Sequence, residues 1–351
     1  MQHNESEWFY KPVKKLDVDT LKKAEAHQAC LTKPPGSLGD LEHVAVKFAA
    51  WQGRVNPELE RIGICVFAAD HGICAKGVSA FPQAVTVQMI ANFVAGGAAI
   101  SVLAKSLNTD FSVVNMGVAH PLLAEDGVVQ AAVAAGTADF SEQAAMLPAQ
   151  CLQALNAGKQ QVINTDWQLF IGGEMGIGNT TSATAIYCAL LDISPDDAAG
   201  PGTGINAEGI SLKAQLINQA LARHVDQAST PLHILQTLGG FEIAALVGSY
   251  IACAQQGIPI LVDGFICTAA ALIAIQLNPD VQQWMLFAHK SAEPAHCHAL
   301  DYLQVRPLLD LSMRLGEGSG AAVAVPILQS ALQLHNHMAT FAQANVSGGP
   351  L

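Results

Sequence analysis

Short apolar runs recur through the middle of the chain, and each leads into a turn marked by glycine, an acidic residue or histidine. The runs span residues 62–68, 111–115, 169–171, 258–262 and 284–288. They are continuously apolar rather than alternating, which is typical of strands buried on both faces. We therefore predict five strands at these positions.

Stretches of helical length separate the predicted strands. The clearest of them span residues 84–105, 180–191, 210–224 and 241–256. Alternation of strands and helices predicts βαβ units, and hence an α/β fold with a doubly wound, mostly parallel sheet and helices on both faces. Ligands of such sheets bind beyond the carboxyl ends of the strands, so candidate site residues are sought there.

The two ends of the chain differ from this middle part. Residues 1–56 are richer in charge, helical in pattern and interrupted by a Lys-Pro-Pro-Gly sequence at 33–36. The stretch from 325 to 344 is again helical and amphipathic. We therefore expect a large α/β domain over residues 57–324, with 1–56 and 325–351 forming a small helical domain together.

The composition narrows the classes of function. Of 351 residues, 51% are hydrophobic and 13% charged, and the formal net charge is −12. A negative protein is a poor partner for nucleic acid or an anionic membrane, since both attract basic patches. A surface poor in charge indicates burial against another subunit, so we expect a homo-oligomer. The uncharged segment 243–262 is interrupted by Gly257 and Pro259, which favours a buried helix and strand over a membrane span.

Cysteine usage indicates a reducing compartment. The eight cysteines lie mostly in apolar runs and form no CxxC pair, and residues 1–15 contain no apolar stretch of a signal peptide. We expect a cytoplasmic protein. His296-Cys297-His298 looks metal-binding, but adjacent residues of a helix point in different directions. We therefore expect no metal and no cofactor.

A glycine-rich segment at 172–181 follows one predicted strand and opens a predicted helix. Its glycines allow a ligand to approach the backbone closely, and Asn179 or Thr180 can cap the helix. The free N–H groups and dipole of that helix start would bind a phosphate. A tight structural turn is the alternative, but the strand–glycine–helix order favours contact with a phosphate or ribose.

A second glycine loop, at 200–204, is followed by Lys213 in a predicted helix. Basic residues are scarce in this half of the chain. After Lys159 and apart from Lys213, they are Arg223, Lys290, Arg306 and Arg314. Lys213 is therefore a candidate phosphate ligand, although a solvated surface lysine is the usual fate of this residue type.

Carboxylates stand at several turns. Glu317 lies among three glycines before an apolar helix. In an apolar pocket its pKa would rise and it could serve as a general base, whereas a surface turn is the alternative. The segments 70–72 and 263–264 end strands, where Asp70 and Asp263 either orient a substrate or cap a helix. The Asp-Asp pair at 196–197 is not at a strand end, so a magnesium-bound diphosphate donor is not indicated.

Taken together, these segments resemble the nicotinate-nucleotide–dimethylbenzimidazole phosphoribosyltransferase family. The matching segments run in order along most of the chain: KPPGSLG at 33–39, ADHG at 69–72, PQ at 82–83 with VT at 85–86 and Gln88, GGAAI at 96–100, GEMGIGNTT at 173–181, GPGTG at 200–204, LGGFE at 238–242, DGF at 263–265 and RLGEGSG at 314–320. No single glycine loop is specific, but their number and order are.

The resemblance implies a homodimer with a helical small domain. It also implies an enzyme that moves the ribose 5-phosphate of nicotinate mononucleotide to 5,6-dimethylbenzimidazole. The products would be α-ribazole 5′-phosphate and nicotinate, in assembly of the nucleotide loop of cobalamin. Glu317 would remove the proton from the incoming base, and Glu174 would be a second acidic residue close to the ribose.

The resemblance also implies a set of substrate-binding residues. The phosphoribosyl group would be held by Gly176, Gly178, Asn179, Thr180, Gly202 and Lys213. The region of Phe81 and Gln88 would help to form the base pocket. The other residues of the set are Thr203, Asp263, Ser291 and Leu315.

Two positions depart from the family pattern. Asn115 stands where an aspartate is expected after the second strand, and Phe81 occupies a base-pocket position that varies within the family. Which base is preferred, and whether the amide form of the donor is accepted, therefore stay open. Two rival functions also stay open: a nucleosidase that hydrolyses nicotinate mononucleotide, and a non-catalytic nucleotide-binding protein.

Overall fold

A six-stranded sheet forms the centre of the computed structural model, which describes residues 5–122, 127–226 and 228–347. The strands are β1 (Ile62–Ala69), β2 (Asp110–Gly117), β3 (Val128–Gln130), β4 (Leu169–Met175), β5 (Ile260–Val262) and β6 (Met285–Phe287). Their order is β3-β2-β1-β4-β5-β6, and all the described neighbours pair in parallel. The predicted parallel α/β sheet is confirmed.

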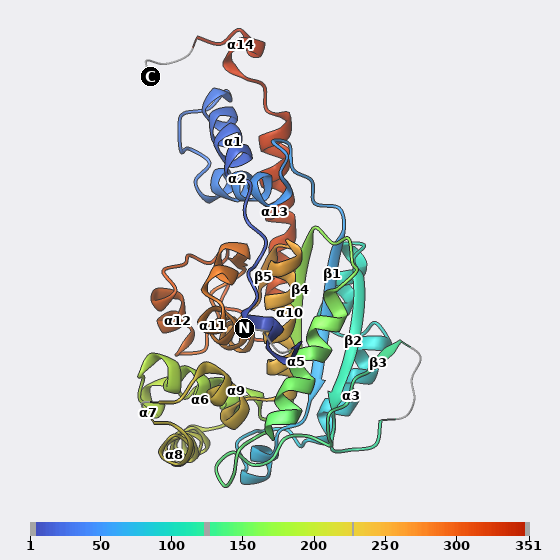
Figure 1. Ribbon diagram of the computed structural model, residues 1–351, viewed down its shortest axis with the longest axis vertical. Coiled ribbons are helices and arrows are strands. Elements are labelled where there is room, and N and C mark those ends of the chain that lie inside the picture. Colours follow the sequence, from blue (N-terminus) through green and yellow to red (C-terminus); the bar gives the residue numbers. More distant parts are fainter. Residues whose placement is uncertain (1–4, 123–126, 227, 348–351) are drawn as a thin grey trace.

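Helices connect these strands and surround the sheet (Figure 1). Those of the central part are η2 (Gly72–Lys76), α3 (Ala84–Val94), α4 (Ala99–Ser106), α5 (Pro148–Val162), α6 (Asn179–Leu191), α7 (Pro195–Ala198), α8 (Ala207–His224), α9 (Pro231–Leu238), α10 (Phe241–Gln256), α11 (Phe265–Leu277), η3 (Pro279–Trp284) and α12 (His296–Tyr302). The 3₁₀-helix η1 (Glu5–Tyr10) precedes them.

Two successive glycines of β4 show how the layers are arranged. Side chains alternate between the faces of a strand, so Gly172 and Gly173 face opposite sides of the sheet. A Cβ at Gly172 would lie 2.4 Å from Leu246 of α10, and one at Gly173 would lie 2.1 Å from the carbonyl oxygen of Glu317. Helix α10 therefore covers one face, and the loop that carries Glu317 packs directly on the other.

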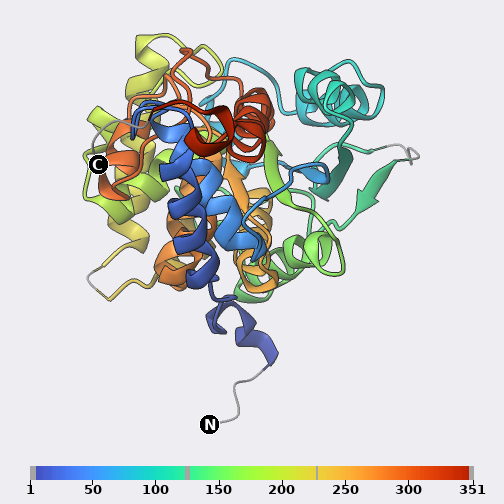
Figure 2. The same ribbon diagram turned by 90° about the horizontal axis from the view of Figure 1, so that it is seen from above.

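Helices from the two chain ends pack together as α1 (Val18–Cys30), α2 (Asp40–Gln52), α13 (Ser319–His337) and α14 (Phe341–Ala344). Figures 1 and 2 show the blue and red helices side by side. Gln28 of α1 donates a 2.8 Å hydrogen bond to His335 of α13. Because α13 is continuous from the sheet into this group, the boundary proposed at 324/325 lies inside one helix, and the domain division stays a proposal.

Three sequence predictions need correction. The predicted helix at 84–105 is two helices, α3 and α4, because Gly96 takes a left-handed φ of +82° between them. The predicted helix at 325–344 begins earlier, at Ser319, and is interrupted after His337. The edge strand β3 was not predicted, since it is only three residues long and largely exposed.

The segment Ala84–Ser106 has the length and composition of a membrane span, with a mean hydropathy of 1.7. It contains the break at Gly96, and α3 and α4 pack against β1 and β2. Only 33% of its most apolar part is buried, so this pair of helices leaves an apolar surface exposed.

Candidate active site

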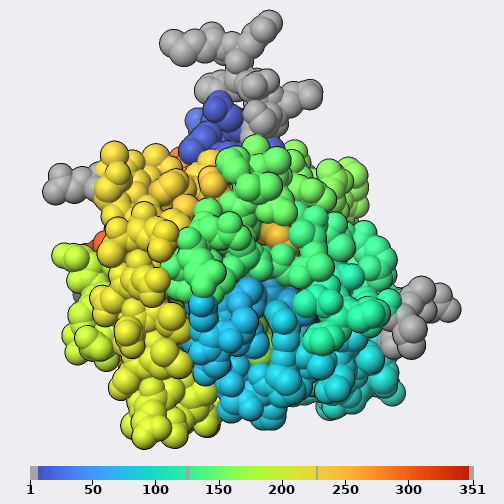
Figure 3. Space-filling model, turned by 90° about the horizontal axis from the view of Figure 1, so that it is seen from below, coloured from blue at the N-terminus to red at the C-terminus, as the bar shows by residue number. Residues whose placement is uncertain are grey.

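A cavity of about 480 Å³ opens at the carboxyl ends of β4, β5 and β6. Figure 3 views the molecule from this end of the sheet. The residues predicted from the sequence that line it are Phe81, Glu174, Gly176, Asn179, Thr180, Gly202, Thr203, Asp263, Ser291, Leu315 and Glu317. Two further predicted residues, Gly178 and Lys213, lie directly behind this lining. The turn at 176–178, the loops at 200–204 and 314–318, and the ends of β4, β5 and β6 thus meet in a single cavity.

Glu174, near the end of β4, is one of two carboxylates at the centre of the cavity. It is buried, and Asn179 donates a hydrogen bond to its Oε2. Burial raises its pKa well above the ordinary value, and the charges of Glu242 and Asp263 add to this effect. A Cβ at Gly316 would lie 2.4 Å from Oε1 of Glu174, so the loop that contains Gly316 packs closely against this carboxylate.

Glu317 is the second central carboxylate, held in a conformation that non-glycine residues seldom adopt. Its φ is +65°, between Gly316 and Gly318, which are also left-handed. The side chain is only 7% exposed, and within the described structure its Oε2 has no hydrogen-bond partner. Burial raises its pKa, and the charge of Asp263 adds to the rise. A buried carboxylate with a free oxygen and a raised pKa is suited to accept a proton.

The cationic end of the cavity is built around Lys213 of α8. Its side chain is 1% exposed, so it is not a solvated surface lysine. The amine donates hydrogen bonds to Thr180 Oγ1 over 3.2 Å and to the carbonyl of Gly200 over 3.1 Å. Burial lowers its pKa to about 8, an effect that the charge of Glu293 opposes.

The second glycine loop is fixed against this end from two sides. Arg314 donates a 3.1 Å hydrogen bond to the carbonyl of Gly202, and the backbone N–H of Ala80 donates to Thr203 Oγ1 over 3.1 Å. A Cβ at Gly202 would lie 2.7 Å from Thr180 Oγ1, so only glycine lets the loop come this close. Both glycine segments of the sequence therefore serve the same end of the cavity.

Asp263 and Ser291 lie at the ends of the next two strands. Asp263 accepts a 2.7 Å hydrogen bond from the backbone N–H of Ala321 in the first turn of α13. The Nε2 of His289 lies 3.6 Å from Oδ1 of Asp263. The N–H of Ser291 donates to His296 Nδ1 over 2.8 Å. Asp263 thus caps a helix and also lines the cavity, and its orientation of a substrate stays a prediction.

Another part of the cavity lining is apolar and open. Phe81 and Leu315 are 51% and 60% exposed at its rim, and Val85 and Met89 of α3 line it. Gln88 is exposed on α3 and does not line the cavity. A flat aromatic ring fits this part better than an anion.

Asn115 lies outside the cavity lining, near the carboxyl end of β2 and between β1 and β3. Its Nδ2 donates a 2.9 Å hydrogen bond to Gln130 of β3, and its Oδ1 accepts one of 3.0 Å from the N–H of Gly117. An aspartate could not donate to Gln130. The asparagine that departs from the family pattern therefore links β2 to β3 through its side chain.

Two titratable residues of the cavity were missed by the sequence analysis. Glu293 is buried beside Lys213, and burial raises its pKa while Lys213 and Arg314 oppose the rise. His289 fills the space left by two glycines, since a Cβ at Gly320 would lie 2.1 Å from its ring. Neither residue lies in a glycine-rich segment. The sequence indicated them only through their position after the predicted strand at 284–288.

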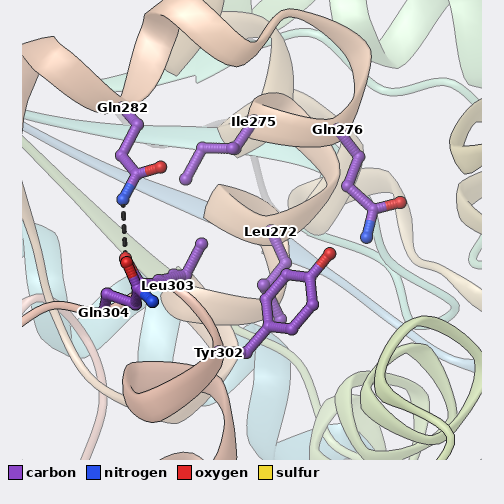
Figure 4. A pocket seen from close by; sticks show the side chains of 7 residues that line it. All are labelled: Leu272, Ile275, Gln276, Gln282, Tyr302, Leu303 and Gln304. Carbon is purple, nitrogen blue, oxygen red and sulfur yellow. Dashed lines mark hydrogen bonds between the residues drawn. The ribbon is translucent and has the colours of Figure 1, made fainter.

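A second hollow, between α11, η3 and α12, has no comparable chemistry (Figure 4). Its lining is Leu272, Ile275, Gln276, Gln282, Tyr302, Leu303 and Gln304. It contains no carboxylate, amine or imidazole. Over the described ranges, no group of three or more His, Cys, Asp or Glu side chains is arranged to hold a metal ion.

A cavity with a buried lysine behind its lining, an apolar part and several buried carboxylates, at the carboxyl ends of a parallel sheet, is typical of an enzyme that acts on nucleotides. Comparison with known proteins identifies the family. A family model described as phosphoribosyltransferase matches residues 13–346, and the chain belongs to this family. The resemblance inferred from the sequence is confirmed.

The relatives agree with this assignment over nearly the whole chain. A nicotinate-nucleotide–dimethylbenzimidazole phosphoribosyltransferase of Pseudomonas fluorescens is 55% identical over 346 residues, covering 98% of this chain and 99% of its own. One of Pseudomonas aeruginosa is 54% identical over 347 residues, with the same coverage. A crystal structure of the Thermus thermophilus enzyme of that name is similar with a TM-score of 0.89 at 42% identity, covering 95% of this chain and 100% of its own.

Proposed function

We propose that this protein transfers the ribose 5-phosphate of nicotinate mononucleotide to 5,6-dimethylbenzimidazole or a closely related base. The products are the α-ribotide of the base and nicotinate. The observation that carries the proposal is the buried carboxylate of Glu317, which lines the cavity and whose Oε2 has no hydrogen-bond partner among the described residues. Full-length relatives that bear this enzyme name support it.

Each end of the cavity takes one part of the reaction. The phosphate binds at the first turn of α6 and Lys213, and the base stacks between Phe81, Met89 and Leu315. The two substrates then meet at Glu174 and Glu317. Holding both rings in one cavity supplies much of the rate through proximity.

The bond changes balance without a metal ion. The bond from C1′ to the pyridinium nitrogen breaks, and its electron pair stays with that nitrogen, so nicotinate leaves with an uncharged ring. A lone pair of the benzimidazole attacks C1′ from the opposite face, which turns a β-nucleotide into an α-nucleotide. The other ring nitrogen passes its proton to Glu317, and Glu174 in its ionised form stabilises positive charge on the sugar, which its raised pKa makes more effective at higher pH.

We also propose that the enzyme is a cytoplasmic homodimer. Val102 of α4 is more than half exposed, and α3 with α4 leaves an apolar surface uncovered. All eight cysteines are free thiols, which favours a reducing compartment.

One incubation separates this proposal from its rivals. Purified protein is mixed with nicotinate mononucleotide, with and without dimethylbenzimidazole, and the products are separated by chromatography. The proposal expects an α-ribotide and nicotinate only when the base is present. Release of nicotinate without the base would indicate a nucleosidase, and binding without turnover would indicate a non-catalytic nucleotide-binding protein.

A further inference from the structure

A buried pair of side chains lies beneath the glycine turn at 176–178 without lining the cavity. His71 follows β1, and Glu242 lies in the first turn of α10; both are 0% exposed. His71 Nε2 is hydrogen-bonded to Glu242 Oε1 over 2.6 Å. The pair cannot touch a ligand in the cavity directly, because neither residue belongs to its lining.

The side chain of His71 lies beside the turn at both of its glycines, with its Cβ next to Gly178 and its ring next to Gly176. A Cβ at Gly178 would lie 3.2 Å from the Cβ of His71, and one at Gly176 would lie 3.4 Å from His71 Cδ2. From another side, the backbone N–H of Ile177 donates a 3.2 Å hydrogen bond to Thr86 Oγ1. The turn therefore has the ring of His71 beside its first glycine, the Cβ of His71 beside its last glycine, and one hydroxyl bonded to its middle residue.

Gly240 shows that the fold makes room for this pair. Its φ of −144° and ψ of 162° suit any residue, so backbone conformation does not explain a glycine here. A Cβ at this position would lie 2.3 Å from His71 Cε1 and 2.6 Å from Glu242 Oε2. The space that a side chain would fill is taken by the pair.

Global stability is a weak explanation for such a pair. Removing an imidazole and a carboxylate from water costs free energy that their mutual attraction only partly returns. Within the described structure, His71 Nδ1 and Glu242 Oε2 have no hydrogen-bond partner, which adds to that cost. An apolar pair of similar volume would fill the space without the cost. The contact with the glycine turn is what distinguishes this arrangement.

We propose that His71 and Glu242 are positioning residues, which hold the turn at 176–178 and the first turn of α6 in the geometry that binds the phosphoribosyl group. The carboxylate orients the ring, and the ring supports the turn that presents Asn179 and Thr180 to the donor. This inference rests on the proposed function. It explains why the sequence carries ADHG and LGGFE segments whose side chains do not line the cavity.

The test compares binding of the two substrates by titration calorimetry. In His71→Ala, the Kd for nicotinate mononucleotide should rise about tenfold or more, because a small displacement of binding groups is costly. The Kd for dimethylbenzimidazole, which we propose to stack on Phe81, Met89 and Leu315 rather than on the turn, should change less than about twofold. Imidazole added at millimolar concentration should occupy the space left by the deleted ring of His71 and restore much of the donor affinity.

Two further variants keep the test decisive. Glu242→Asp keeps the charge and the fold but withdraws the carboxylate by one methylene, so donor Kd should rise about threefold to tenfold. His335→Ala is the matched control, since His335 is also 0% exposed and hydrogen-bonded but lies among the helices of the chain ends. It should lower the melting temperature and leave the donor Kd unchanged.

The outcomes separate this inference from the proposed function. Unchanged donor affinity in His71→Ala, or in Glu242→Asp should His71→Ala not fold, overturns the positioning role. Equal weakening of both substrates also overturns it, because a general loss of structure would then be the cause. A wild-type protein that does not bind nicotinate mononucleotide overturns the proposed function, and this inference with it.

Discussion

Lys213 donates a hydrogen bond from its buried amine to the hydroxyl of Thr180 over 3.2 Å. The contact joins α8 to the first turn of α6. Lys213 and the glycine-rich segment at 172–181 therefore lie at the same binding position. The same amine also bonds the carbonyl of Gly200 at the start of the second glycine loop. A phosphate that binds here would meet backbone N–H groups and one ammonium group together.

Replacing Lys213 by alanine should therefore weaken donor binding more than it slows chemistry. Loss of one charge-assisted contact should cost about 1.5–3 kcal/mol of binding free energy, with a smaller change in kcat. Calorimetric titration with nicotinate mononucleotide checks this. Lys290→Ala is the control, because Lys290 is an exposed lysine paired with Asp310 at the surface. Unchanged affinity in Lys213→Ala would remove Lys213 from the phosphate site.

The lowered pKa of Lys213 gives this prediction a pH dependence. Its pKa is about 8 in the free protein, so the amine is mostly charged below that pH and mostly neutral above it. Donor affinity should then decline as the pH rises through about 8. Titrations on either side of this pH should show the decline in the wild type but not in Lys213→Ala.

Much of the fold could be predicted because buried parallel strands are apolar along their whole length. Strand β1 is buried throughout, β4 in all but its last residue and β2 from Val113 onward, and all three were found from such runs. The break at Gly96 was not foreseen, since a glycine inside an apolar helical pattern is often tolerated. Whether one takes a left-handed conformation depends on the packing around it.

Site residues could be predicted where they lie in glycine-rich segments. They could not be predicted where only the tertiary packing brings them to the cavity. Glu174 and Glu317 lie in glycine-rich segments, which drew attention to them. His289 and Glu293 have no such neighbours on their own strand connection, and they reach the cavity only because β6 lies next to β5. Their roles in binding, like those of the predicted residues, stay predictions that mutation must test.

A dimer should form through apolar surface that the single chain leaves exposed. Val102 of α4 is 57% exposed, although it lies in an apolar helix. Sedimentation of the wild type should give a dimer at micromolar concentration. Val102→Glu places a charge on this surface and should shift the protein towards monomer, if α4 belongs to the interface.

Lys290→Glu, on another exposed surface, is the comparison for that experiment. It should leave the assembly unchanged. A wild type that sediments as a monomer would rule out the dimer. A dimeric Val102→Glu variant would place the interface elsewhere.

Glu174→Gln should slow turnover by about tenfold to a hundredfold. The glutamine keeps the volume of the side chain, and its amide oxygen can still accept from Asn179. It removes the negative charge that stabilises positive charge on the sugar in the transition state. Because Glu317 still accepts the proton, activity should keep its rise with pH. Steady-state rates over a pH series check both points, and loss of that rise would make Glu174 the base.

Glu317→Gln should lower kcat and kcat/KM together by about a hundredfold or more, with both substrates still bound. Glutamine keeps the size and one acceptor oxygen but cannot take a proton. The base attacks through a nitrogen that is already unprotonated, so removal of the other nitrogen's proton becomes necessary only as the new bond forms. The carboxylate is therefore needed mainly in the transition state.

The pH profile distinguishes this role from a structural one. Burial first, and then the charge of Asp263, raise the pKa of Glu317 above its ordinary value. The ionised form is the active base, so wild-type activity should rise as the pH passes upward through this raised pKa and then level off. The glutamine variant should lose the part of the rise that comes from Glu317 and keep only the part that comes from ionisation of Glu174, whose pKa is also raised. Wild-type turnover by Glu317→Gln would show that another group takes the proton, and Glu174 would be the first to examine.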